Sequence, residues 1–231
     1  TSRQREFEAM RAVHDVVPVP EVLWVDANGC ALGRPALITS FVEGVTKPTD
    51  TSSNITGFGT VLDANLREKL VRQFIEHLKA IHATDIQAPV LASFQLPDSD
   101  TKQAARWQLN WWTTVWHNDA LRGIPVLGLA ERWMRENLPE TAELVLVHGD
   151  YRTGNYLFEE NSATISAILD WEFTHIGDYH EDLAWISLRP WSHIENGTLL
   201  ASSLLPCDDL FSRYATVTGR EIDPRTLHFY Q

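Results

Sequence analysis

The chain has 231 residues, 44% of them hydrophobic and 10% aromatic, so it can bury the core of one large domain. Its formal charge of −12 argues against a nucleic-acid partner, because proteins that bind phosphate backbones concentrate Lys and Arg. Two cysteines, Cys30 and Cys207, are too few for a disulfide framework or a Cys-rich zinc site, so we interpret their thiols as buried or incidental. No apolar run approaches the roughly 20 residues that cross a bilayer. We therefore expect a cytoplasmic protein without a membrane partner.

The N-terminal part of the chain predicts a helix followed by two strands. Apolar residues recur at helical spacing over residues 2–15, and two prolines then end the helix. Residues 20–25 and 35–42 have the composition of strands, with an Asp-Ala-Asn-Gly turn after the first. Residues 47–63 are rich in Thr, Ser, Asn, Gly and Pro and show no periodicity, which predicts a loop.

Helical patterns dominate the middle and the end of the chain. Residues 64–83 carry one apolar stripe, and their two histidines, His77 and His82, are five residues apart, so we interpret them as packing or surface residues rather than as ligands of one metal. Further helices are predicted over residues 130–137, 181–188 and 205–219. Residues 100–118 hold four tryptophans at helical steps, which we interpret first as core or as a helix interface and second as the hydrophobic wall of an acceptor pocket; they are Trp107, Trp111, Trp112 and Trp116.

Polar residues follow or separate three apolar runs that predict short buried strands, residues 144–147, 156–158 and 165–169. Asp150 is suited to accept a proton from a hydroxyl, while Asn155 and Asp170 offer the oxygen ligands that Mg²⁺ prefers. Each of these residues alone fits an ordinary turn. Their combined spacing predicts a catalytic site made of His148, Asp150, Asn155 and Asp170. The segment Gly-Asp-Tyr-His-Glu-Asp-Leu-Ala, which follows Ile176, supports this prediction.

This spacing resembles the catalytic loop of protein kinases, and still more the His-Gly-Asp-x-x-x-x-Asn loop and Ile-Leu-Asp-Trp-Glu segment of the aminoglycoside phosphotransferase and choline kinase-like family. The motifs Asp-Tyr-Arg-Thr-Gly-Asn, Leu-Asp-Trp-Glu and Arg-Pro-Trp are similar to those of a broad branch of bacterial phosphotransferases related to the kinase-like domains fused to acyl-CoA dehydrogenases. The resemblance covers nearly the whole chain. It implies an α+β, protein kinase-like two-lobe fold, with residues 1–42 as a remnant of the nucleotide-binding lobe and hinge and residues 43–231 as a helical catalytic lobe containing a catalytic β-hairpin.

Within the catalytic loop, the resemblance makes Asp150 the catalytic base and His148 a residue that orders the loop. It makes Asn155 and Asp170 the metal ligands. Arg152 lies where protein kinases place the catalytic-loop Lys, which implies contact with the transferring phosphoryl group.

Asp182 is expected, by the same resemblance, to reach back to the main chain near His148 and Gly149. The alternative is a plain acid in the first turn of a helix, where it interacts with the helix dipole.

On the nucleotide side, the resemblance assigns adenine to the Ser40 carbonyl and the Val42 amide, although residues 35–42 also fit a simple strand that ends at a Gly turn. Glu6, with Glu8 as the second choice, corresponds to the carboxylate that pairs with a nucleotide-binding Lys, and a solvent-exposed carboxylate is an equal alternative. No Gly-rich loop or strand Lys precedes the helix, so we expect the small lobe to be largely missing and the chain to be truncated at both ends.

The sequence therefore favours an ATP- and Mg²⁺-dependent phosphotransferase that acts on a hydroxyl of a small molecule. It does not distinguish ATP from GTP or identify the acceptor. A kinase-like pseudoenzyme or binding module is the alternative, because the nucleotide-binding Lys is missing. A third hypothesis is metal-dependent hydrolysis at a cluster of His148, Asp150, His175 and His180, which lacks a recognisable zinc-ligand spacing.

Overall fold

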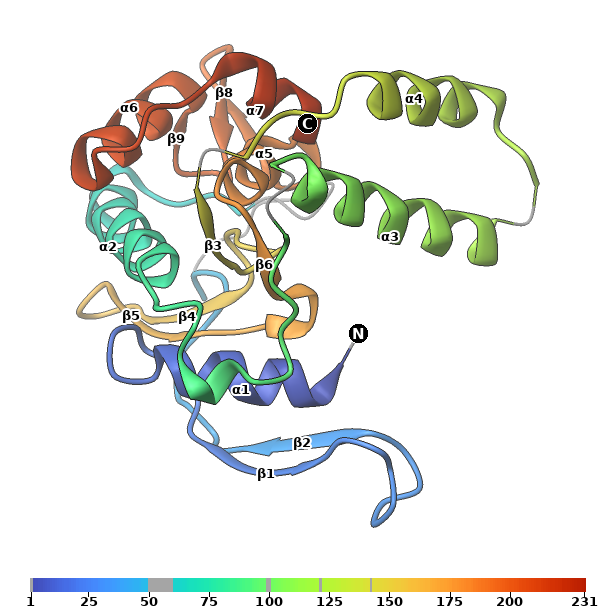
Figure 1. Cartoon of the computed structure of the whole chain (residues 1–231). Helices are drawn as coiled ribbons and strands as arrows, with labels where there is room; N and C mark the ends of the chain where they lie inside the picture. Colours follow the sequence, from blue (N-terminus) through green and yellow to red (C-terminus); the bar gives the residue numbers. More distant parts are fainter. Residues whose placement is uncertain (1, 50–59, 99–100, 121, 142) are drawn as a thin grey trace.

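Helices surround small antiparallel sheets in the computed structural model, which describes residues 2–49, 60–98, 101–120, 122–141 and 143–231 (Figure 1). The helices are α1 (Arg3–Val13), α2 (Ala64–His82), α3 (Gln103–Asp119), α4 (Pro125–Glu136), α5 (His180–Ser187), α6 (Cys207–Thr218) and α7 (Pro224–Tyr230). The strands are β1 (Val22–Asp26), β2 (Ala36–Thr39), β3 (Leu144–Val147), β4 (Tyr156–Glu159), β5 (Thr164–Ile168), β6 (His175–Asp178), β7 (His193–Glu195), β8 (Thr198–Ala201) and β9 (Leu205–Pro206). Single 3₁₀ turns are η1 (Pro89–Leu91), η2 (Trp171–Phe173) and η3 (Arg189–Trp191).

The strands pair as β1 with β2, β3 with β6, β4 with β5, and β7–β8–β9, all antiparallel. The three strands predicted around the catalytic loop are present, but β3 pairs with β6, which the sequence patterns did not predict, rather than with either hairpin strand. The predicted strand 35–42 is too long, because β2 ends at Thr39 and residues 40–42 lead into a bridge between Val45 and Phe158. Of the predicted loop 47–63, residues 50–59 lie outside the described part of the chain.

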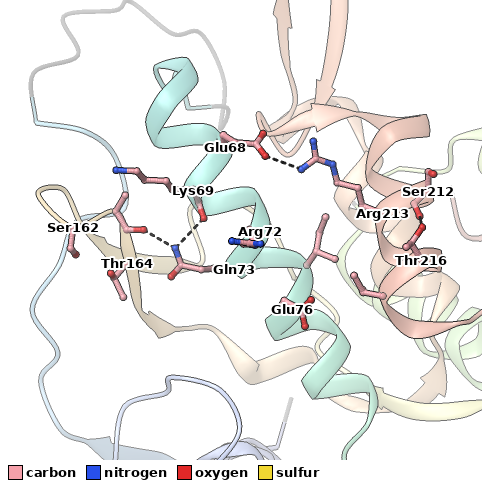
Figure 2. Close-up of a pocket in the computed structure, with 13 residues that line it drawn as sticks. Glu68, Lys69, Arg72, Gln73, Glu76, Ser162, Thr164, Ser212, Arg213 and Thr216 are labelled. Carbon is pink, nitrogen blue, oxygen red and sulfur yellow. Dashed lines mark hydrogen bonds and ion pairs between the residues drawn. The ribbon is translucent and has the colours of Figure 1, made fainter.

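The hairpin of β4 and β5 is attached to α2 by one side chain. Gln73 Nε2 donates to the Ala163 carbonyl at 2.7 Å and to the Lys69 carbonyl at 3.1 Å, while its Oε1 accepts from the Ile165 amide at 2.9 Å (Figure 2). Asn155 precedes this hairpin and Asp170 follows it. The turn is therefore fixed on α2, and the two ends of the hairpin carry the two predicted metal ligands.

The core lies where α2 packs against the catalytic-loop strands. Leu70, Phe74 and Leu78 of α2 are almost fully buried, as their apolar stripe predicts, and each such side chain contributes about 1.5–3 kcal/mol through burial. Tyr151 of the loop is buried against Phe74, with ring centroids 4.4 Å apart, and its hydroxyl donates to the Phe74 carbonyl at 2.8 Å. The catalytic loop is thus packed directly on the main hydrophobic core.

The tryptophans of the aromatic helix α3 are not core residues, although Trp112 and Trp116 lie at its interface with α4, which the first interpretation also allowed. The buried residues of α3 are Ala104, Ala105 and Leu109, whereas none of its four tryptophans is buried, and Trp107 and Trp112 are exposed. The small residues allow α3 to approach the body of the protein closely, so the bulky rings are left at the edges of the contact. α3 and α4 project together from the rest of the molecule (Figure 1). α4 begins five residues before the predicted start, with Pro125 at a position that tolerates proline.

Cys30 is exposed and Cys207 is half-buried, so of the two interpretations of the thiols the buried one does not apply. The short strands β7 to β9 were not predicted. None of the helices in the described residues is both long and apolar enough to span a bilayer.

Candidate active site

Asp150 is held by three hydrogen-bonding side chains at the end of β3. Its Oδ1 accepts from Arg152 Nε at 2.8 Å and from Trp185 Nε1 at 2.6 Å, and its Oδ2 accepts from Asn155 Nδ2 at 2.6 Å. The residue is only 6% exposed, so these bonds replace most of its hydration. Such charge-assisted bonds fix the direction of the carboxylate.

Arg152 lies against Asp150, and its guanidinium also lies over the ring of Trp191, 5.4 Å from the centroid. The structure therefore brings Arg152 to the carboxylate of Asp150, where it compensates the negative charge. Its predicted contact with a phosphoryl group stays a prediction.

The loop that carries Asp150 is fastened from behind by Asp182. This carboxylate has no exposed surface, and it accepts from the amides of His148 and Gly149, each at 2.9 Å. The predicted contact of Asp182 with the loop main chain is present. A third donor, His82 Nε2, lies 3.0 Å from Asp182, and the Nδ1 of the same ring lies 2.7 Å from the hydroxyl of Tyr214.

His82 is buried, as the packing interpretation predicted, but sequence reasoning missed its contact with Asp182. A histidine in the last turn of an otherwise apolar helix stripe was the available signal. Burial opposes ionisation of Asp182, but the hydrogen bond and charge of His82 outweigh it and lower the pKa of this carboxyl.

His148 connects the two ends of the site. Its Nε2 donates to the Leu169 carbonyl at 3.0 Å, which places the proton on Nε2 and lets Nδ1 accept from the Asp150 amide at 3.2 Å. Complete burial lowers the pKa of His148, which favours this neutral tautomer. Gly149 next to it has a φ of +85°, and a Cβ there would lie 2.7 Å from the Phe173 Cβ, so only glycine fits this turn.

The predicted metal ligands meet beside Asp150. Asn155 donates twice through its Nδ2, to the carbonyl and to the carboxylate of Asp150, so its Oδ1 points away and accepts no hydrogen bond from the described residues. The Asn155 carbonyl accepts from the Leu169 amide at 2.8 Å, which brings Asp170 alongside.

Asp170 has a left-handed backbone, with φ +65° and ψ +57°, a conformation that costs a non-glycine residue roughly 1–3 kcal/mol. Partial burial and the nearby carboxylates of Glu172 and Asp150 raise the pKa of Asp170. The site thus collects negative charge around one free amide oxygen and one exposed carboxylate, a donor set that suits a hard divalent cation.

The predicted nucleotide residues lie on the other side of Asp170. Glu6 forms a short ion pair with Arg3 of the same helix, and both residues line a cavity of about 420 Å³ together with Asp170. Glu8, the second choice, faces the opposite way, since its carboxylate accepts from the amide and hydroxyl of Ser93 at 2.9 and 2.7 Å.

Ser40 and Val42 lie in the link between β2 and the large lobe and do not line that cavity. The link is set against the hairpin by Gly44, where a Cβ would lie 2.7 Å from Ser166 Oγ. The structure therefore places Glu6 and Asp170 in the wall of one cavity and the two predicted adenine contacts outside that wall.

An aromatic surface adjoins the carboxylate of Asp150. Trp185, which donates to Asp150, packs against Trp191 at a centroid distance of 4.7 Å and is stacked with Trp112 of α3 at 6.2 Å. Phe173 lies 6.0 Å from Trp112. The second interpretation of the tryptophan stripe, a hydrophobic wall near the site, therefore agrees with the geometry better than the first.

The hydrolase hypothesis receives no support from the arrangement. His175 pairs with Glu181 at 2.9 Å and His180 with Asp178 at 2.6 Å, while His148 faces a carbonyl. Within the described ranges, no three His, Cys, Asp or Glu side chains converge as a ligand set for a metal.

A cavity of about 850 Å³ lies away from this site, between α2, the β4–β5 turn and α6 (Figure 2). Its walls are joined by the exposed ion pair of Glu68 with Arg213 at 3.2 Å, and none of the predicted site residues lines it. We therefore place the candidate site by chemistry and not by cavity size.

Comparison with known proteins gives consistent results. Residues 1–204 match the model of a family described as the phosphotransferase enzyme family. Acyl-CoA dehydrogenase family member 10 of Mus musculus is 29% identical over 186 residues, which are 80% of this chain and 16% of that protein. Acyl-CoA dehydrogenase family member 11 of Homo sapiens is 27% identical over 223 residues, 93% of this chain and 27% of that protein. The chain thus spans about a quarter or less of the length of these two relatives.

Solved structures show the same fold. A candidate aminoglycoside phosphotransferase from Ralstonia eutropha superimposes with a TM-score of 0.70 at 22% identity, covering 98% of this chain and 69% of that one. An aminoglycoside-3'-phosphotransferase of type VIII gives a TM-score of 0.63 at 20% identity, covering 97% and 77%. The mixed helix and sheet fold is therefore the kinase-like fold of aminoglycoside phosphotransferases, and the chain belongs to the phosphotransferase enzyme family.

Proposed function

We propose that the protein transfers the γ-phosphoryl group of ATP to a hydroxyl of a small molecule, with Asp150 as the catalytic base. The observation that supports this most directly is the convergence of Asp150, Asn155 and Asp170 on a loop held by the buried Asp182. The main chain of an ordinary exposed turn is hydrogen-bonded by water, so it does not require a buried carboxylate such as Asp182 to accept from its amides.

In the proposed reaction, Asp150 accepts the proton of the acceptor hydroxyl while the hydroxyl oxygen forms a bond to the γ-phosphorus. The bond from that phosphorus to the bridging oxygen of the nucleoside diphosphate breaks, and the diphosphate leaves. Trp185 and Asn155 hold the carboxylate in one orientation, and this positioning supplies much of the acceleration.

The donor set fits Mg²⁺. Asn155 would present its free Oδ1 and Asp170 its exposed carboxylate, and the ion would neutralise charge on the phosphate oxygens. Glu6 and Arg3 line the same cavity as Asp170, so we place the nucleotide phosphates there. The Ser40 carbonyl and Val42 amide remain the proposed adenine contacts.

The acceptor side of Asp150 is formed by Trp185, Trp191 and Trp112. We infer that the acceptor carries its hydroxyl next to an apolar surface that packs on these rings. The solved aminoglycoside phosphotransferases share the fold with this chain, and the fold alone does not transfer their substrates to it.

A binding module without turnover is the second candidate. Arg152, Asn155 and Trp185 together occupy both oxygens of Asp150, which would oppose proton transfer if Arg152 never moved away. This candidate predicts nucleotide binding without transfer to any acceptor.

Thermal unfolding of the full chain tests the proposal, because a ligand that binds only the folded state raises the melting temperature. ATP and GTP are each added with and without Mg²⁺ and with a panel of hydroxylated small molecules. We expect a rise that needs both nucleotide and Mg²⁺ and that Asp170→Ala abolishes, whereas Asp119→Asn, at an exposed acid that ends α3, retains it. No rise with either nucleotide would contradict the assignment.

A further inference from the structure

A separate cavity of about 290 Å³ lies between α1, α3 and the segment Glu172–Ile176. In the described part of the chain, none of its lining residues makes a hydrogen bond to Asp150 or Asn155. Its volume is at the small end of ligand pockets, which hold about 300–1,000 Å³. The cavity is therefore large enough for one ring compound and is distinct from the catalytic carboxylate.

Aromatic rings form much of its wall. Trp107 and Trp111 come from α3, Phe94 from the segment after η1, and Phe173 from η2. The Trp111 and Phe173 rings meet edge to face, with centroids 5.7 Å apart, while Trp107 is 36% exposed although it is the largest type of side chain. An indole left open inside a concave surface offers a ring ligand more apolar contact than it now has.

Two charged side chains at this cavity form no ion pair with the described residues. Arg5 of α1 has none, in contrast to its neighbour Arg3, which is paired with Glu6. Glu172 also has none, although it lies near enough to Arg3 to raise the pKa of that guanidinium. Both side chains are half-buried, so each loses hydration without a salt bridge in its place.

The third charged residue of the wall, His175, is already satisfied. Its Nδ1 faces the Phe173 carbonyl at 2.8 Å and its Nε2 faces the Glu181 carboxylate at 2.9 Å. Both partners are acceptors, so both ring nitrogens carry protons and the imidazolium is neutralised by Glu181. The charges left for a ligand are one guanidinium and one carboxylate.

We propose that this cavity binds an aromatic zwitterion, an aromatic α-amino acid, with its carboxylate on Arg5, its ammonium on Glu172 and its ring between Trp107 and Trp111. This pairing satisfies both free charges at once, and the guanidinium accepts a carboxylate in bidentate geometry. The cavity touches α1, which carries Glu6, and the segment directly after Asp170. A bound amino acid therefore changes the affinity of the protein for Mg²⁺–nucleotide. This change in affinity rests on the proposed function, whereas the binding of the amino acid does not.

Calorimetric titration of the full chain with four probes tests the proposal. The probes are L-phenylalanine, 3-phenylpropionate, which lacks the ammonium, 2-phenylethylamine, which lacks the carboxylate, and L-alanine, which lacks the ring. We expect saturable binding of L-phenylalanine, affinity lower by about tenfold or more for each ring compound that lacks one charge, and no measurable binding of L-alanine.

Variants assign each contact. Arg5→Met should weaken L-phenylalanine and 3-phenylpropionate about tenfold and leave 2-phenylethylamine unchanged, and Trp107→Ala should weaken all three. Arg11→Met is the matched control, because Arg11 lies on the same helix with its guanidinium over Phe7. The unchanged amine affinity shows that Arg5→Met is folded.

Three outcomes would overturn the inference: no saturable binding of L-phenylalanine, equal affinities in wild type and Arg5→Met, or loss of binding in Trp185→Phe, which would move the ligand to the catalytic site. Nucleotide binding is measured separately on the same samples. A chain that binds L-phenylalanine but no nucleotide would retain this inference and remove the proposed function.

Discussion

Replacing Asp182 tests whether the catalytic loop is held from behind. Asp182→Ala removes the acceptor for two buried amides, those of His148 and Gly149, and for His82 Nε2. Each buried donor left without a partner costs about 1–3 kcal/mol, and breaking a buried charged pair costs about 3–5 kcal/mol. These contributions are not additive, so we expect a loss of about 3–5 kcal/mol in the free energy of unfolding.

Denaturant unfolding at pH 7 measures this loss. Asp208→Ala is the matched control, because Asp208 is an exposed acid in the first turn of α6 and contributes only about 0.3–1 kcal/mol through the helix dipole. A loss for Asp182→Ala as small as that of the control would refute the anchoring role.

The pH dependence gives a second check on Asp182. Its pKa is lowered in the folded state, so its contribution to stability is present above the unfolded value of about 3.9 and is lost as the pH falls through the folded value. The difference between wild type and Asp182→Ala should therefore shrink only below about pH 4. A difference that disappears already at pH 6 would contradict the assignment.

Five other substitutions have distinct expected outcomes. Asp150→Asn should slow phosphoryl transfer by about 100-fold or more in a labelled-ATP assay, with nucleotide affinity retained. Asp170→Ala should raise the Mg²⁺ concentration needed for nucleotide binding more than Asn155→Ala does, because it removes an anionic ligand. A calorimetric titration in which both variants need the same Mg²⁺ concentration would contradict this. Trp185→Phe loses one hydrogen bond to Asp150 and should slow turnover about tenfold at unchanged nucleotide affinity. Burial opposes protonation of His175, but Glu181 and the Phe173 carbonyl outweigh burial and raise the pKa of the ring. Its contribution to the free energy of unfolding is therefore complete below about pH 6.5 and is lost as the pH rises through the folded pKa. In unfolding experiments, His175→Gln should not show this loss of stability with rising pH.

The local part of the site could be predicted because its residues are close in sequence. The spacing of His148, Asp150, Asn155 and Asp170 spans only two turns and one hairpin, so the motif itself fixes their neighbourhood. The apolar stripe of α2 predicted its buried face for the same reason, since helical periodicity is a local property.

Contacts between distant segments could not be predicted. His82 reaches Asp182 across 100 positions, and the pairing of β3 with β6 skips a complete hairpin. Periodicity alone could not decide whether the tryptophans of α3 lie in the core, at a helix interface or in a pocket wall, because it shows which residues share a face and not which face is covered. The small side chains of Ala104 and Ala105 decided the packing instead.

Transfer of labelled phosphate from γ-labelled ATP to a panel of hydroxylated small molecules, with Mg²⁺ and the full chain, tests the central claim most directly. We expect the wild type to label at least one acceptor with an apolar ring or chain beside its hydroxyl, and Asp150→Asn to label the same acceptor about 100-fold or more slowly. Labelling by Asp150→Asn at the wild-type rate would contradict the account, because the carboxylate that Asn155 and Trp185 hold in place would then have no part in the chemistry.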